Sequence, residues 1–228
     1  MKALLLAAGF GTRLQPLTNH LPKCLFPIQG QPLLGHWLHL LSDAGINDFL
    51  INTHYLHSLV KEWAEQSIFN DQITLTYENP ILGTAGTLLN NLDFIGSEPI
   101  MLIHADNICT ANFSAFIKAH RNRPRNTYMT MMTFTTDDPK SCGVVSLSSD
   151  GIIESFHEKV SNPPSNHANA AIYIIEPSMI RQLANQSPPI TDFSTEVIPN
   201  HLTQIYTYHN DCYHRDIGTV SSYLQAIL

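Results

Sequence analysis

The chain has 228 residues, of which 43% are hydrophobic and 14% are charged, and its formal net charge is −7 at pH 7. No apolar run approaches the roughly 20 residues that a membrane-spanning helix needs, and an acidic balance without clustered Lys and Arg argues against nucleic acid as a partner. The four cysteines form no CxxC pair, which disfavours a zinc site and indicates reduced thiols in a cytoplasmic protein. An α/β chain of this length often forms one domain, so we expect a single domain over residues 1–228.

The first part of the chain, about residues 1–125, alternates short apolar runs with segments of helical period. This alternation is typical of an α/β fold whose sheet is largely parallel. Short connections between the segments suit strand–helix–strand crossovers. The expected strands are 3–8, 49–53, 73–77 and 100–104, and the expected helices are 32–44, 56–68, 85–92 and 113–120.

The second part, about residues 126–228, has a different pattern. Residues 148–151 read Ser-Ser-Asp-Gly, a hairpin turn signal between two short apolar runs. No linker separates the two parts, so the change marks a sub-structure within one domain. The expected strands are 128–134, 144–147, 152–156, 170–175 and 204–208, and the expected helices are 177–184, 196–202 and 220–228.

The clearest chemical signal is the hexapeptide GFGTRL at residues 9–14, which leaves the first expected strand. Glycines let the backbone turn so that N–H groups face phosphate oxygens, and Arg13 and Lys23 add cationic donors. No Asp or Glu occurs before Asp43, so a small anion is expected to bind here. The spacing excludes a dinucleotide-binding GxGxxG and a Gly-Lys-Ser/Thr phosphate loop, although GxG alone also suits an ordinary strand-to-helix turn.

The run LAAGFGTRLQPLTNHLPKCLFPI at residues 6–28 resembles the signature of the sugar-1-phosphate nucleotidylyltransferases. The segments LGTAG, CGVV, FHEK, NAAIYI, FSTEVIP and RDIGT are similar to later motifs of that family and follow in the family's order, so the resemblance covers essentially the whole chain. It implies a three-layer α/β/α nucleotide-binding fold with a mostly parallel central sheet. The chain is too short for the C-terminal β-helix that many members of the family carry.

The resemblance also implies which residues bind the nucleotide. Arg13 and Lys23 would be the catalytic cations, and Glu78 would begin a loop that lines the base pocket. A carboxylate only accepts hydrogen bonds, so it suits guanine's adjacent N–H donors, although the N3–H of uracil or thymine would also satisfy it; an exposed loop acid is the alternative. The residues expected to contact the nucleotide are Leu6, Ala8, Gly9, Gly11, Thr12, Arg13, Glu78, Gly83, Thr84 and Asp106.

Two aspartates are the expected ligands of a metal cofactor, Mg²⁺. Asp106 ends an apolar run, so it should project from the carboxyl end of a strand, where open α/β sheets place their ligands. Asp216 follows 110 residues later in His-Arg-Asp-Ile-Gly-Thr. Mg²⁺ is usually held by one or two carboxylates with phosphate oxygens and water, and by similarity to the family these two aspartates supply them. The alternatives are a turn aspartate and a helix cap, respectively.

Sugar-phosphate binding falls, by the same resemblance, to five residues. A lysine can meet the sugar phosphate, while a carboxylate and an amide can bond sugar hydroxyls with directional specificity. Ala171 stands where the family usually has Gly, which puts the shape of the sugar pocket in question. An exposed ion pair is the alternative for the adjacent Glu and Lys. The expected residues are Lys23, Gly143, Glu158, Lys159 and Asn169.

The resemblance implies a transferase of nucleotide-sugar biosynthesis that joins an NTP to a sugar 1-phosphate and releases pyrophosphate. GTP with the 1-phosphate of mannose or a related hexose or heptose is the favoured pair. The alternatives are a uridylyl- or thymidylyltransferase acting on glucose 1-phosphate or an amino-sugar 1-phosphate, a CTP enzyme for phosphocholine, and a non-catalytic nucleotide-sugar sensor. The sequence leaves open the sugar, the base and whether the chain forms a homo-oligomer.

Overall fold

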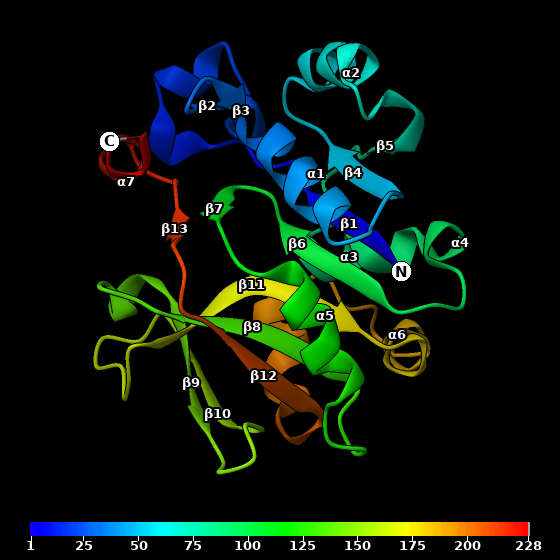
Figure 1. The fold of residues 1–228 in the computed structure, drawn as a ribbon, viewed down its shortest axis with the longest axis vertical. Coiled ribbons are helices and arrows are strands. Elements are labelled where there is room, and N and C mark those ends of the chain that lie inside the picture. The colour runs from blue at the N-terminus through cyan, green and yellow to red at the C-terminus, as the bar shows by residue number, and fades with distance from the viewer. Residues whose placement is uncertain (228) are drawn as a thin grey trace. The chain divides into compact units, whose positions relative to one another are not determined.

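The computed structural model describes residues 1–227 (Figure 1). Its contacts divide the chain into two compact units, each built from separate stretches of sequence. No helix among the described residues is both long and apolar enough to cross a membrane. The expectation of one domain that changes character near residue 125 stays a prediction. The first unit comprises 1–82, 103–110 and the chain from 213 onward, and the second comprises 83–102 and 111–212.

Three parallel strands form the sheet of the first unit, in the order β1, β4, β5. Leu4 lies beside Leu50, and all strand residues from Phe49 to Thr53 are buried. Helices connect the strands, and the buried face of α1 includes Trp37, which is 1% exposed. The parallel sheet and its crossover helices confirm what the sequence pattern predicts. The bounds are β1 Lys2–Leu6, α1 Leu33–Asp43, β4 Phe49–Thr53, α2 His57–Gln66 and β5 Ile73–Tyr77.

Short antiparallel pairs complete the first unit. The strand β7 pairs with β13 so that Asn107 lies opposite Asp216. The indole N–H of Trp37 donates to the Asn107 carbonyl oxygen over 2.9 Å, which ties β7 to α1. Of the elements β2, β3, β7, β13 and α7, only the helix α7 was expected from the sequence. The bounds are β2 Pro27–Ile28, β3 Gln31–Pro32, β7 Asn107–Cys109, β13 His214–Asp216 and α7 Val220–Ile227.

The second unit holds a mixed sheet in the order β10, β9, β11, β8, β12. Its pairs are antiparallel except the parallel pair of β8 with β12. The strand β6, Ile100–His104, runs along the chain from the second unit into the first. The remaining strands are β8 Met129–Thr135, β9 Gly143–Leu147, β10 Ile153–Glu158, β11 His167–Ile175 and β12 Ile205–Asn210, and the helices are α3 Thr84–Asn90, α4 Leu92–Ile95, α5 Phe113–Arg121 and α6 Pro177–Ala184.

The fold is therefore of the mixed α/β class with a mostly parallel central sheet, as expected. One predicted helix differs: 196–202 is no regular α-helix but a π-helix over Phe193–Val197 followed by a 3₁₀ turn over Ile198–Asn200. Pro199 lacks an N–H, so an α-helical hydrogen bond cannot form at that position. The predicted helix 85–92 is likewise divided, at Asn91, into α3 and α4.

A buried histidine in the second unit makes stability depend on pH. The His120 side chain is 2% exposed, and its nitrogens lie 2.7 Å from Thr130 Oγ1 and 3.1 Å from Glu176 Oε1. Burial, followed by the positive charges of Arg123 and Arg121, lowers the pKa of His120 to about 3. The folded protein therefore keeps His120 neutral, whereas in the unfolded chain its pKa is about 6.5.

We expect His120 to remove stability as the pH falls from about 6.5 toward 3, because only the unfolded state takes up a proton there, at a slope of up to about 1.4 kcal/mol per pH unit. The free energy of unfolding, measured with urea between pH 6.5 and 5, should depend less steeply on pH for His120→Gln than for wild type. This pH range lies above that in which most carboxylates titrate. The exposed His20→Gln is the control. Equal slopes in wild type and His120→Gln would contradict the assignment.

Candidate active site

The loop after β1 has a conformation that requires glycine. Gly11 has φ +62°, in the left-handed region, and a Cβ atom built there would lie 2.8 Å from Cγ2 of Thr18. The hydroxyl of Thr18 donates to the Gly11 carbonyl oxygen over 2.9 Å, and the Tyr55 hydroxyl donates to the Thr18 carbonyl oxygen over 2.9 Å. A larger residue at position 11 would strain the backbone and displace Thr18, which braces the loop that carries Arg13.

Lys23, Asp106 and Asp216 form a compact group in the first unit, here called the lysine–carboxylate cluster. The Lys23 ammonium nitrogen lies 2.9 Å from Asp106 Oδ2 and 2.7 Å from Asp216 Oδ1. Arg13 joins the cluster at its edge, with Nη2 3.4 Å from Asp216 Oδ2. The lysine side chain is 8% exposed, while both aspartates are about half exposed, at 45% and 50%. The carboxylates therefore converge on one cation and stay open to solvent.

The β7–β13 pair explains how residues 110 positions apart come together. Asp106 immediately precedes β7, and Asp216 ends β13 opposite Asn107. Gly218 leaves room for the ion pair, because a Cβ at this position would lie 2.6 Å from Asp216 Oδ2 and 2.7 Å from Arg13 Nη2. The RDIGT motif therefore supplies both a carboxylate and the space beside it, a role of Gly218 that the sequence analysis missed.

Electrostatics keep Lys23 and Asp106 ionised. Burial alone would lower the pKa of Lys23, but the charges of Asp106 and Asp216 outweigh burial and raise it above its ordinary value. Burial would raise the pKa of Asp106, and the charges of Lys23 and His104 outweigh it, so that pKa is lowered. The cluster thus presents a fixed ammonium between two carboxylates, an arrangement suited to binding groups that carry charge.

The other predicted nucleotide residues of the first unit follow the strand ends. Leu6 ends β1, Ala8 is 5% exposed, and Gly9 and Thr12 are exposed in the glycine loop. Glu78 differs from the expectation of a carboxylate open to a base, because it is 3% exposed. Both of its carboxylate oxygens accept hydrogen bonds from the protein, over 3.0 Å and 3.1 Å.

Two predicted nucleotide residues belong to the second unit. Gly83 immediately precedes α3, and Thr84 is the first residue of that helix. The Thr84 hydroxyl oxygen accepts from the Phe193 N–H over 2.7 Å and lies 3.4 Å from Asp192 Oδ2. These contacts join the LGTAG segment to the FSTEVIP segment, so two motifs far apart in sequence form one piece of structure.

The structure brings together the predicted sugar-phosphate residues of the second unit. Gly143 and Glu158 are partners in the β9–β10 ladder, and Lys159 Nζ lies 3.2 Å from Glu158 Oε1. Asn169 donates to the hydroxyl of buried Tyr173 over 2.7 Å. Burial raises the pKa of Tyr173, the Asn169 hydrogen bond opposes this, and the charge of Glu158 adds to the rise. Glu158 and Asn169 thus act on the same phenol.

The residue that departs from the family's pattern, Ala171, has φ +55°. This left-handed conformation costs roughly 1–2 kcal/mol for a residue with a Cβ, which is a physical reason for glycine at the corresponding position. The Ala171 N–H donates to Asn169 Oδ1 over 2.9 Å. The departure therefore adds backbone strain beside Asn169 and leaves the predicted sugar-phosphate side chains in place.

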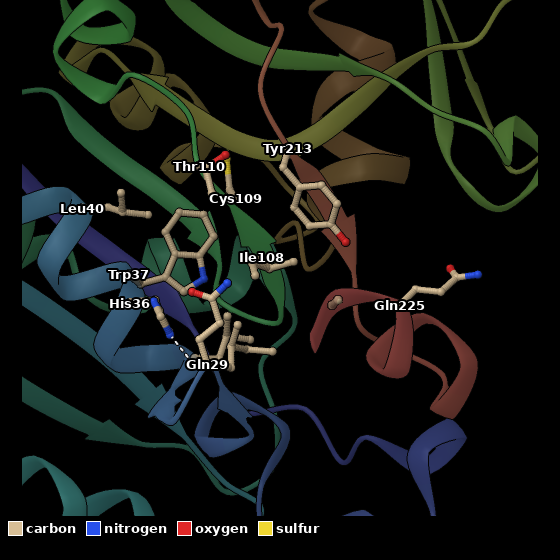
Figure 2. Close-up of a pocket in the computed structure, with 12 residues that line it drawn as sticks. Gln29, His36, Trp37, Leu40, Ile108, Cys109, Thr110, Tyr213 and Gln225 are labelled. Atoms are coloured by element: carbon tan, nitrogen blue, oxygen red, sulfur yellow. Dashed lines mark hydrogen bonds between the residues drawn. The ribbon is translucent and has the colours of Figure 1, made fainter. Parts of the chain in front are cut away.

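A separate pocket of about 390 Å³ lies in the first unit (Figure 2). Trp37, Ile108 and Tyr213 are among its walls, and Gln29 and Gln225 stand at its edge. None of the predicted site residues lines it, and none of its lining residues is Lys, Arg, Asp or Glu. This pocket lacks the cations that a triphosphate requires. It is distinct from the lysine–carboxylate cluster because it shares no residue with it.

A glycine loop follows the first strand of a parallel α/β sheet, and two cationic side chains and two carboxylates lie beside it, an arrangement suited to binding phosphate groups. Comparison with known proteins identifies the class of protein. A profile described as nucleotidyl transferase matches residues 2–228. The chain belongs to that family.

Relatives found by sequence include proteins named as mannose-1-phosphate guanylyltransferases. The chain is 33% identical to a mannose-1-phosphate guanyltransferase of Schizosaccharomyces pombe and 32% identical to the mannose-1-phosphate guanylyltransferase catalytic subunit beta of Danio rerio, over 98% of its length in both cases. It spans only 62% and 63% of those two proteins. The crystal structure of HddC from Yersinia pseudotuberculosis, complexed with GMP-PN, superposes with a TM-score of 0.83 at 22% identity, covering 99% of this chain and 97% of that one.

Proposed function

We propose that this chain is a Mg²⁺-dependent nucleotidyltransferase that joins GTP to mannose 1-phosphate, or to a related hexose or heptose 1-phosphate. The products are an NDP-sugar and pyrophosphate. The observation that carries the proposal is Lys23 bonded to both Asp106 and Asp216 beside the glycine loop. Relatives named as mannose-1-phosphate guanylyltransferases support the choice of substrates.

The side chains of the cluster fit Mg²⁺. Asp106 and Asp216 both approach the same Lys23 nitrogen, so their oxygens converge, and both are about half exposed. Among residues 1–227, no group of three or more His, Cys, Asp and Glu side chains is placed to hold a metal ion. Mg²⁺ commonly takes one or two carboxylates and completes its shell with phosphate oxygens and water. When bound, Mg²⁺ would add positive charge at the phosphates.

The reaction proposed is in-line attack of a sugar-phosphate oxygen on the NTP α-phosphorus. The new P–O bond forms as the bond to pyrophosphate breaks, and no proton transfer is needed because the sugar phosphate is already ionised. Two anions must meet, so the protein's task is alignment and charge neutralisation. Lys23 would hold the attacking and α-phosphates, and Arg13 would hold the departing pyrophosphate. Glu158, Lys159 and Asn169 would hold the sugar phosphate.

A pyrophosphate-release screen of the four NTPs against a panel of sugar 1-phosphates tests the proposal. We expect GTP with mannose 1-phosphate or a close analogue to give the highest kcat/KM. Preference for UTP or dTTP would replace guanine in the proposal, and turnover of CTP with phosphocholine alone would replace the sugar. Nucleotide binding without any turnover would identify a sensor and overturn the proposed enzyme.

Arg13→Lys should lower kcat more than it weakens NTP binding. The Arg13 side chain is 67% exposed, so it is free to reach a ligand, and its planar fork can bind two pyrophosphate oxygens where Lys offers one point charge. Charge on the leaving group grows in the transition state, so the loss should appear mainly in kcat. Steady-state kinetics at saturating GTP measure it. An unchanged kcat with only a raised KM would refute this role.

A further inference from the structure

The Glu78 carboxylate is held by hydrogen bonds from other groups of the protein. It follows β5 directly, and Oε1 accepts from Asn52 Nδ2 over 3.0 Å while Oε2 accepts from the Leu82 N–H over 3.1 Å. The second bond closes the loop of residues 78–82 onto its own first side chain. A carboxylate that is 3% exposed and accepts two bonds from the protein is anchored by that protein.

Asn52 connects this loop to the first strand. It lies in the central strand β4 and is 3% exposed. Its Oδ1 accepts from the Ala7 N–H over 2.7 Å, and its NH₂ group donates to Glu78. The amide is therefore oriented by both neighbours, since only its oxygen can accept from Ala7 and only its nitrogen can donate to a carboxylate. One side chain thereby joins the end of β1, where the glycine loop begins, to the loop after β5.

The main chain of Glu78 is fixed as well. Its N–H donates to the Thr53 carbonyl oxygen over 2.9 Å, and its carbonyl oxygen lies 2.7 Å from His54 Nδ1. The His54 ring in turn packs edge-on against Phe10 of the glycine loop, with ring centroids 5.2 Å apart. Side-chain and main-chain contacts thus converge on the start of the 78–82 loop and tie it to the loop expected to bind phosphate.

We infer that Glu78 and Asn52 are positioning residues for nucleotide binding. They set the shape of the 78–82 loop and its distance from the glycine loop, and Glu78 does not itself read the base. The inference rests on the proposed nucleotidyltransferase function. It differs from the sequence expectation, in which the Glu78 carboxylate accepts directly from guanine. A residue that binds the base directly and a positioning residue respond differently when the hydrogen bonds of Glu78 and Asn52 are broken and then restored.

Two single variants break the pattern and their combination restores it. Glu78→Gln places an NH₂ group against one of two donors, Asn52 Nδ2 or the Leu82 N–H. Asn52→Asp places a carboxylate against the Glu78 carboxylate. In the double variant, the new Asp accepts from the Ala7 N–H and from the new Gln, whose oxygen accepts from the Leu82 N–H. All three contacts then again pair a donor with an acceptor.

The measurements are kcat and KM for every NTP that the wild type accepts, with GTP and UTP binding by calorimetry. Each single variant should lose about ten- to hundredfold in kcat/KM through KM, for all bases alike, because a buried group left without its partner costs the most. The double variant should recover to within a few-fold of wild type. Glu62→Gln, the same change on an exposed face of α2, is the matched control.

A loss confined to GTP, or a double variant that recovers nothing, would overturn the inference and return Glu78 to the role of base reader. No loss in either single variant would overturn it too. If a single variant does not fold, the double variant alone decides, by recovery or its absence. A wild type that binds nucleotide but releases no pyrophosphate would overturn the proposed function only, since the calorimetric comparison still reports on positioning.

Discussion

Asp106→Asn and Asp216→Asn should each fold normally and lose most turnover. Each change removes one anionic oxygen without changing side-chain volume, and in the proposed reaction that oxygen holds Mg²⁺ on the phosphates. Metal-based charge stabilisation is worth several kcal/mol, so the loss in kcat should be at least about a hundredfold. Both side chains are about half exposed, and each variant leaves Lys23 one of its two carboxylate partners, so folding should be retained.

Pyrophosphate release measured across a Mg²⁺ titration, with thermal unfolding of each variant, tests this expectation. Asp71→Asn provides the matched control, because Asp71 is exposed before β5 and away from the cluster. A variant that keeps a near-wild-type rate at saturating Mg²⁺ would remove that residue from the metal site. A variant that unfolds would instead show that the carboxylate supports the β7–β13 region.

The strands β4 and β6 were predictable because their apolar composition reflects their burial, and the less buried β5 was predictable because it contains β-branched residues. The expected strands 49–53, 73–77 and 100–104 agree with β4, β5 and β6 at both ends. The first two and their connecting helix α2 also appear in the expected order. Apolar and β-branched runs of about five residues, separated by amphipathic segments, carry this information locally.

The pairing of β7 with β13 was not predictable from local pattern. Each strand has three residues, too few for a periodic signal, and the partners are more than 100 positions apart. Yet this pairing places Asp216 beside Asp106. The resemblance supplied both aspartates as candidates, whereas their common contact with Lys23 required the structure.

The burial of Glu78 was not predictable from the sequence. The resemblance implies that its loop lines the base pocket, but whether a carboxylate faces a ligand or the protein depends on what its neighbours donate. Asn52 in the buried run FLINT is a signal that could have indicated this, because a buried amide needs partners. At Ala171 the family's usual glycine indicates a position with positive φ, and φ is positive there in the structure.

Lys23→Met should separate metal binding from turnover. Met keeps a long apolar side chain in a position that is 8% exposed but carries no charge. The ammonium occupies the space between Asp106 and Asp216, so its removal leaves a more negative site. We therefore expect tighter Mg²⁺ binding in the absence of nucleotide, together with a kcat lowered by about 10²- to 10³-fold because a preorganised charge on the transferring phosphates is lost.

Calorimetric Mg²⁺ titration and pyrophosphate release on the same preparations measure the two effects. Lys61→Met is the matched control, since Lys61 is exposed on α2 and 3.8 Å from Glu65, its partner at i+4. The opposite signs of the two effects are the diagnostic feature, because general loss of structure would weaken both metal binding and turnover. Weaker Mg²⁺ binding in a folded Lys23→Met variant would show that the carboxylates do not bind the metal in the manner proposed. A kcat close to wild type would show that Lys23 organises the carboxylates without acting on the phosphates.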